Sequence, residues 1–118
     1  MKLAWKLQEK TRKSPVGLAS FNTAKKCMEL LEGILAKEAE NGKISCTLRA
    51  NSIVCSHQDE TESQVKKMLF DDDFKNNVIA EVVRWFVGNF LKQEGVSMTV
   101  TRDERHFPIA HFSWMDWM

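Results

Sequence analysis

Residues 42–57 read GKISCTLRANSIVCSH, and their alternating pattern decides how the rest of the chain is interpreted. Every second side chain in 44–48 is apolar, and a similar alternation recurs in 53–57, after Ala50-Asn51. A period of two is typical of half-buried strands. A turn at Ala50-Asn51, or across 49–52, predicts a hairpin in one register, with Leu48 facing Ile53, Cys46 facing Cys55, and Ile44 facing His57.

Residues 96–111 predict a second hairpin of the same kind. Its first strand reads VSMTV at 96–100, where the first hairpin has ISCTL at 44–48. A turn around Asp103-Glu104 predicts three facing pairs, Val100 with Phe107, Met98 with Ile109, and Val96 with His111. Each hairpin follows a helical segment, so we expect two αββ units, 22–57 and 61–114. Their similarity indicates either an internal duplication or only the alternating pattern that all amphipathic hairpins share.

Two longer helices are expected from apolar residues at three- and four-residue spacing. The first begins after the N-cap Asn22 and continues to Ala39, before the stop signal Asn41-Gly42. The second begins at Phe74 and ends at Glu94-Gly95. Its apolar surface is unusually wide, so we expect it to be the most buried helix.

A short helix is expected between the two units, containing Val65, Met68 and Leu69. It is followed by Asp71, Asp72 and Asp73, where the next helix would begin. Carboxylates are favourable in a first helical turn. We therefore interpret these aspartates as capping residues rather than as a divalent metal site.

The N-terminal segment 2–8 also alternates. Leu3, Trp5 and Leu7 fall on one side, which predicts a strand that buries this face. Residues 10–17 are polar and contain Ser14-Pro15 and Gly17, which predicts a loop.

These elements predict an α+β fold for a single domain of residues 1–118. Two main helices would pack on one face of an antiparallel sheet of about five strands, in the order β-α-β-β-α-β-β. That order corresponds to a ferredoxin-like topology with an extra strand, or to the duplicated αββ unit.

The composition favours a soluble cytoplasmic protein. The longest apolar stretches, such as 85–87, are far shorter than the run of about 20 residues that spans a bilayer. The first residues lack the continuous apolar segment of a secretory signal. Three cysteines without a CxxC motif indicate free thiols in a reducing compartment.

The net charge of +1 conceals an uneven distribution. Residues 1–28 carry seven basic side chains and one acidic one, residues 29–73 carry five and ten, and residues 74–118 carry five of each. A chain divided in this way can steer an acidic partner towards one side, unless folding mixes the two regions.

No catalytic motif is present. The chain contains neither a glycine-rich phosphate loop nor a nucleophile elbow, so we expect a protein without enzymatic activity and without a cofactor. One metal site is conceivable, because a hairpin face would carry Cys46, Cys55 and His57, with His111 nearby if the hairpins adjoin. The same residues are common core fillers, and we favour packing over zinc binding.

The C-terminal residues provide the leading functional hypothesis. Two tryptophans and two methionines gather in the last eight positions, and such side chains are favoured at protein-binding surfaces. Pro108 favours an edge position for the last strand, where a second copy could pair to form a homodimer. We expect a small adaptor or inhibitor that docks on a larger protein through Trp114, Met115, Trp117 and Met118, assisted by Arg102 and Arg105.

The alternative hypothesis is nucleic-acid binding by the basic N-terminal region. Its candidate phosphate contacts are Lys6, Lys10, Arg12, Lys13, Lys25 and Lys26. Trp5 could stack on bases if its side of the segment faced solvent. The near-neutral total charge favours the protein-binding hypothesis over this one.

Overall fold

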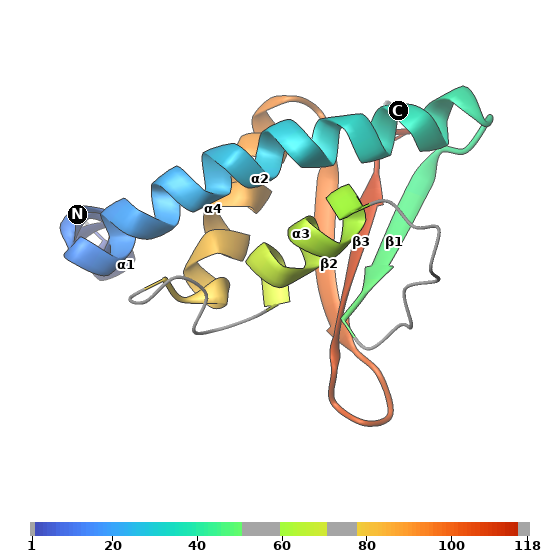
Figure 1. The fold of residues 1–118 in the computed structure, drawn as a ribbon. Helices are drawn as coiled ribbons and strands as arrows, with labels where there is room; N and C mark the ends of the chain where they lie inside the picture. Colours follow the sequence, from blue (N-terminus) through green and yellow to red (C-terminus); the bar gives the residue numbers. More distant parts are fainter. Residues whose placement is uncertain (1, 51–59, 71–77, 116–118) are drawn as a thin grey trace.

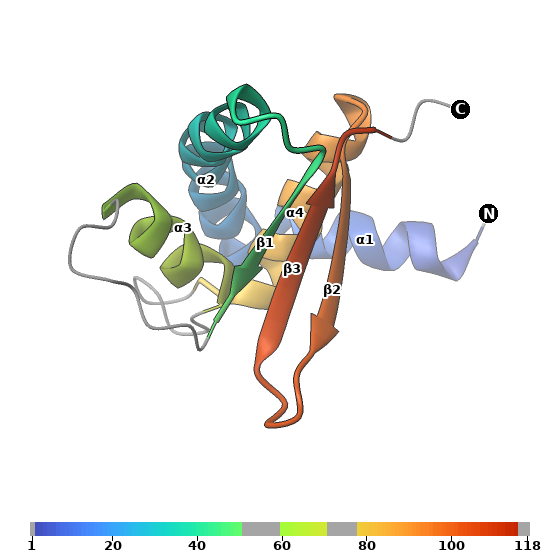
Figure 2. The same cartoon turned by 90° about the vertical axis from the view of Figure 1, so that its right-hand side faces the viewer.

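The computed structural model describes residues 2–50, 60–70 and 78–115. In Figure 1, the long helix α2 extends across the molecule, from α1 at one end to the small sheet at the other. In Figure 2, α2 and α3 lie on one side of the strands. The fold is α+β, with elements in the order α1 (Leu3–Lys13), α2 (Pro15–Glu40), β1 (Ser45–Arg49), α3 (Glu60–Phe70), α4 (Ala80–Gln93), β2 (Ser97–Arg102) and β3 (Pro108–Ser113).

The expected strand at 2–8 is wrong, because these residues form most of α1. Leu3 and Leu7 are four residues apart and lie on one side of a helix, whereas Trp5 lies on the opposite side. A strand would need a sheet to bury that face, whereas α1 contains no buried residue. The lysines and glutamine between the apolar positions are good helix formers, and they favour the helix.

The expected loop at 10–17 is also helical, apart from a break at Ser14. The Ser14 hydroxyl accepts a hydrogen bond of 2.9 Å from the Gly17 N–H, and Pro15 occupies the first turn of α2. Ser-Pro is a strong helix-start signal as well as a turn signal. Helix α2 therefore begins seven residues before Asn22, the start expected from the sequence.

The three helices α2, α3 and α4 supply most of the core. Helix α2 buries the stripe Ala24, Cys27, Leu31 and Leu35, which confirms the spacing expected there. The short helix around Val65, Met68 and Leu69 is confirmed as α3, with all three side chains buried. In α4 the buried residues are Ala80, Val83, Phe86, Val87 and Leu91.

The sheet has three antiparallel strands in the order β1-β3-β2, not about five in a ferredoxin-like order. One cause is the conversion of 2–8 into a helix. The second strand expected in the first hairpin, including Cys55 and His57, lies outside the described residues, as do Asp71 to Asp73. Strand β1 pairs with β3, so the first expected unit contributes a strand that pairs with the second.

Strand β3 is the central strand, which corrects the edge position expected from Pro108. Pro108 is the first residue of β3, a position where a missing N–H is tolerated. Its carbonyl accepts a hydrogen bond of 3.1 Å from the Ala50 N–H. Proline therefore begins this strand without excluding it from the middle of the sheet.

The register of the second hairpin differs from the expected one by three residues. Val100 faces Ala110 rather than Phe107, and Met98 faces Phe112 rather than Ile109. The cause is the longer turn 103–107, where the Asp103 carboxylate accepts hydrogen bonds from the N–H groups of Arg105 (2.8 Å) and Phe107 (3.0 Å). A shift by an odd number of residues exchanges the two faces of the strand.

This register decides which side chains meet the helices. Leu48, Ala110 and Phe112 are buried on the helix side of the sheet. His111 lies on the other side, where its ring nitrogens contact the hydroxyls of Thr47 (3.3 Å) and Thr101 (3.1 Å). The His111 ring is therefore exposed and linked to both neighbouring strands.

Candidate binding surfaces

Helix α1 exposes large apolar side chains that the sequence pattern assigned to a buried face. The exposed fractions are 69% for Leu3, 63% for Trp5 and 52% for Leu7. On α2, Leu18 is exposed as well. Single exposed apolar residues are common, but three large ones on a short helix are not, so α1 is the strongest candidate for a binding element among the described residues.

A groove with an aromatic lining separates α1 from α4. Phe21 of α2 makes edge-to-face contacts with Phe86 and Phe90, at ring-centroid distances of 5.3 and 5.7 Å. Trp85 packs against Phe86 at 5.0 Å. These rings line a hollow of about 290 Å³ together with Gln8, Arg12, Asn89 and Gln93.

The groove continues along α1. A second hollow of about 300 Å³ is lined by Lys2, Ala4, Trp5 and Gln8, and a smaller one of about 150 Å³ by Leu7, Gln8, Thr11 and Trp85. Gln8 lines all three hollows. They therefore form one surface, which we call the α1–α4 groove.

Two cations lie over the aromatic rings of this groove. The Arg12 guanidinium is 5.7 Å from the centre of the Trp85 ring, and the Lys25 ammonium is 5.4 Å from that of Phe21. Contacts of this kind are favourable and hold the cations close to the apolar lining. The groove is therefore apolar at its floor and cationic at its rim.

Other lysines lie on the opposite side of α1. Lys6, Lys10 and Lys13 are spaced by four and three residues, which places them on one helical face. At 100° per residue, that face is roughly opposite Ala4, Gln8 and Thr11, which line the groove. Folding thus keeps the basic region together at the α1 end (Figure 1), and α1 presents a groove side and a lysine side.

The C-terminal candidates do not form one surface with the two arginines. The Trp114 side chain is partly buried against the core, and the Trp114 backbone N–H donates a hydrogen bond of 3.3 Å to the Ile44 carbonyl. Met115 is 46% exposed, whereas Trp117 and Met118 lie outside the described residues. Arg102 and Arg105 are at the turn before β3, about 20 Å away along a six-residue strand.

The described members of the conceivable zinc site point to opposite faces of the sheet. Cys46 pairs with Phe112 on the helix side, while His111 pairs with Thr47 and Thr99 on the other side. Burial, followed by the nearby Glu38 and Glu62, raises the pKa of the Cys46 thiol. Among the described residues there is no group of three His, Cys, Asp or Glu side chains that could hold a metal ion.

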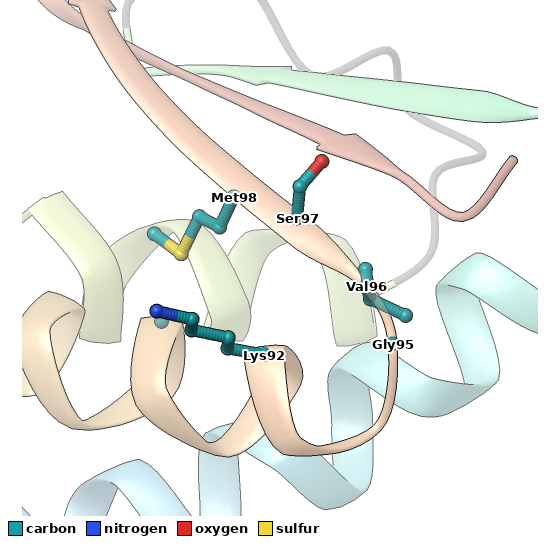
Figure 3. A pocket seen from close by; sticks show the side chains of 6 residues that line it. Lys92, Gly95, Val96, Ser97 and Met98 are labelled. Atoms are coloured by element: carbon teal, nitrogen blue, oxygen red, sulfur yellow. The ribbon is translucent and has the colours of Figure 1, made fainter. Parts of the chain in front are cut away.

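A different hollow, of about 350 Å³, lies between the end of α4 and β2 (Figure 3). The Met98 thioether and the Lys92 ammonium approach each other across it. Ser97 is turned towards β3, and its hydroxyl donates to the Ser113 carbonyl at 3.4 Å. Among the residues lining this hollow there is no paired acid and base that would support catalysis.

Sequence analysis identified the basic residues of this region but not the groove. Its lining comes from α1, α2 and α4, and no short motif links Gln8, Phe21 and Trp85. The sequence feature that could have indicated the groove is the wide apolar surface of α4, because packing against one other helix cannot bury all of it.

No family model matches the chain, and no similar curated protein or solved structure was found. Within the described ranges, every helix is too short or too polar to cross a membrane.

Proposed function

We propose that this chain is a non-catalytic protein-binding module, an adaptor or inhibitor that docks on a larger protein through the groove side of α1. The observation that carries the proposal is the exposure of Trp5 and Leu7, which line the groove, on a helix without buried residues. The setting we propose is the cytoplasm, where the free thiols of Cys27 and Cys46 would stay reduced.

Physical arguments support α1 as the docking element. Complete burial of one large apolar side chain stabilises a complex by roughly 1.5–3 kcal/mol before the costs of association. Tryptophan is also among the residues that dominate interface energetics. Burial of Trp5 and Leu7, the two large apolar side chains of α1 that line the groove, is therefore sufficient to make α1 a major contributor to binding.

The test is affinity capture from an extract of the native host with two matched variants. In the first, Leu3→Gln, Trp5→Gln and Leu7→Gln are combined, because glutamine preserves helix propensity. In the control, Ile44→Gln and Phe107→Gln alter exposed apolar residues at the sheet. We expect the first variant to lose the captured partner and the control to keep it, with unchanged circular dichroism for both. Equal capture by all three proteins would contradict the proposal.

The C-terminal residues remain a second candidate surface for the same function. Deleting residues 114–118 should leave capture intact if α1 is the docking element, and should abolish it if the tail is. Trp114 packs against the core, so the shortened protein must first be shown to be folded, by a cooperative unfolding transition. Homodimer formation through a sheet edge would involve β1 or β2, the two edges of the described sheet, and not β3.

Nucleic-acid binding is the second candidate function, and the lysine side of α1 favours it. Lys6, Lys10 and Lys13 share a face, and Trp5 is exposed enough to stack on a base. This function predicts retention on a polyanion column with strong salt dependence, lost on changing Lys10, Arg12 and Lys13 to glutamate. Failure of the unmodified chain to bind DNA or RNA at low salt would eliminate it.

A further inference from the structure

We infer that the α1–α4 groove takes an acidic amphipathic helix from the partner protein, an inference that rests on the proposed function. The groove lies along α1, an 11-residue helix about 16 Å long. It consists of three adjoining hollows rather than one enclosed cavity. Such a shape fits several side chains of one segment better than it fits a single small molecule.

The lining determines the apolar face of that segment. Phe21, Trp85 and Phe90 supply aromatic surface at one end of the groove, and Leu7 and Trp5 supply apolar surface along α1. Amide side chains of Gln8, Asn89 and Gln93 lie between and around them. Apolar residues spaced by three or four positions on a helix would therefore meet apolar surface at successive points.

The charges determine the other face of the segment. Lys2 and Arg12 line the groove and Lys25 lies over Phe21, whereas none of the described residues lining the three hollows is acidic. The nearest acidic residue on α1, Glu9, is paired with Lys13 at 3.0 Å. Charge complementarity selects a segment with carboxylates beside its apolar residues and rejects a basic one.

A bilayer or a nucleic acid fits this groove less well. The apolar surface lies between two helices, so a flat membrane would meet the rims before the floor. Phe86 is 5% exposed, and Phe21 meets it edge to face, so the floor offers packed edges rather than free faces for stacking. Both polyanions would instead meet the lysine side of α1.

The experiment uses the full 118-residue chain and three synthetic 18-residue peptides. The first carries leucine and phenylalanine at helical spacing with glutamate elsewhere. The second has the same composition in scrambled order, and the third has lysine in place of glutamate. We expect calorimetry to show at least tenfold tighter binding of the first peptide than of either other peptide. Equal affinity for the scrambled peptide would overturn the inference, because the chain would then recognise the composition of the peptide and not its helical spacing.

Two double variants with the same loss of charge locate the binding site. Lys2→Gln with Arg12→Gln removes rim cations, and Lys6→Gln with Lys10→Gln removes cations from the opposite side of α1. We expect at least tenfold weaker peptide binding for the rim variant and less than threefold for the other. Equal losses would overturn the inference.

Two further probes, duplex DNA and phosphatidylglycerol vesicles, distinguish the other partner classes. If either binds more tightly than the acidic peptide, the groove is not the principal binding site and the inference fails. The proposed function is judged separately, because partner capture that depends on Leu3, Trp5 and Leu7 would stand even if the peptide did not bind. Conversely, peptide binding without such capture would leave the groove without the proposed role.

Discussion

At the scale of single residues, Gly17 fixes the junction of α1 and α2. A Cβ atom placed there would collide with the Thr11 carbonyl oxygen, and it would lie 2.9 Å from that of Arg12. Because both neighbours are backbone atoms, Gly17→Ala must push α1 away from α2. Since α1 has no buried residues and can shift away from the added methyl group, we expect a loss of no more than about 1 kcal/mol in the free energy of unfolding, measured with urea.

Gly33 provides the matched control for this substitution. It also lies within α2, but an added Cβ would meet nothing within 4 Å. Gly33→Ala should therefore stabilise the protein by about 0.5–1 kcal/mol through helix propensity. If the two substitutions shift the urea midpoint in the same direction, the contact between Gly17 and α1 does not constrain the fold.

Cys27 is the residue whose ionisation depends most clearly on folding. Burial raises the pKa of its thiol from 9.0 to about 12. A raised folded-state pKa contributes stability that is present below pH 9 and is lost as the pH rises towards 12. At pH 8 we expect iodoacetamide to modify Cys27 in urea but not in the native protein, as measured by peptide mass. Rapid modification of native Cys27 would show that α2 opens readily.

At the scale of elements, α1 shows where sequence patterns fail. Over residues 2–8 the alternation of Leu3, Trp5 and Leu7 fits a strand, yet the pair Leu3 and Leu7 also fits a helix. Burial would distinguish them, but burial depends on distant residues. The pattern was decisive in α3 and in the later part of α2, where the apolar spacing corresponds to a face that the core does bury.

The sheet and the groove show the same limit. The strands at 45–49 and 97–102 were expected close to their observed positions, whereas their neighbours depended on the length of the turn after Asp103. The concentration of basic residues in the N-terminal region could be recognised from the distribution of charge along the sequence. The aromatic floor of the groove could not, because Phe21 and Trp85 meet only after α2 and α4 have packed.

Because α1 is exposed, we expect that the rest of the protein folds without it. Because α1 buries none of its own side chains, deleting residues 1–13 should remove little core energy. We expect the shortened chain to unfold cooperatively, with a free energy of unfolding within about 1 kcal/mol of that of the full chain, because changes at the surface have small effects. Thermal circular dichroism measures this directly. Loss of the cooperative transition would show that α1 is part of the folding unit and would weaken its assignment as a docking element.

At the scale of the molecule, the size of the protein determines whether its uneven charge has consequences. The molecule extends 44 Å in its longest dimension, whereas the Debye length at 0.1 M salt is about 10 Å. Glu38 and Glu40 end the 26-residue helix α2, more than about 30 Å along its axis from the junction with α1, so they cannot cancel the basic charges of α1. A ligand approaching that end meets a cationic surface although the net charge is only +1.

This separation predicts unusual behaviour on a cation exchanger at pH 7. The chain should be retained more strongly than its net charge implies, because a clustered patch contacts the resin as a unit. Changing Lys6, Lys10 and Lys13 to glutamine should shift elution to much lower salt. Changing Lys37, Lys92 and Arg105 to glutamine removes the same charge from scattered positions and should shift it less. Equal shifts would mean that total charge governs retention, and the α1 end would then have no special role in attracting an acidic partner.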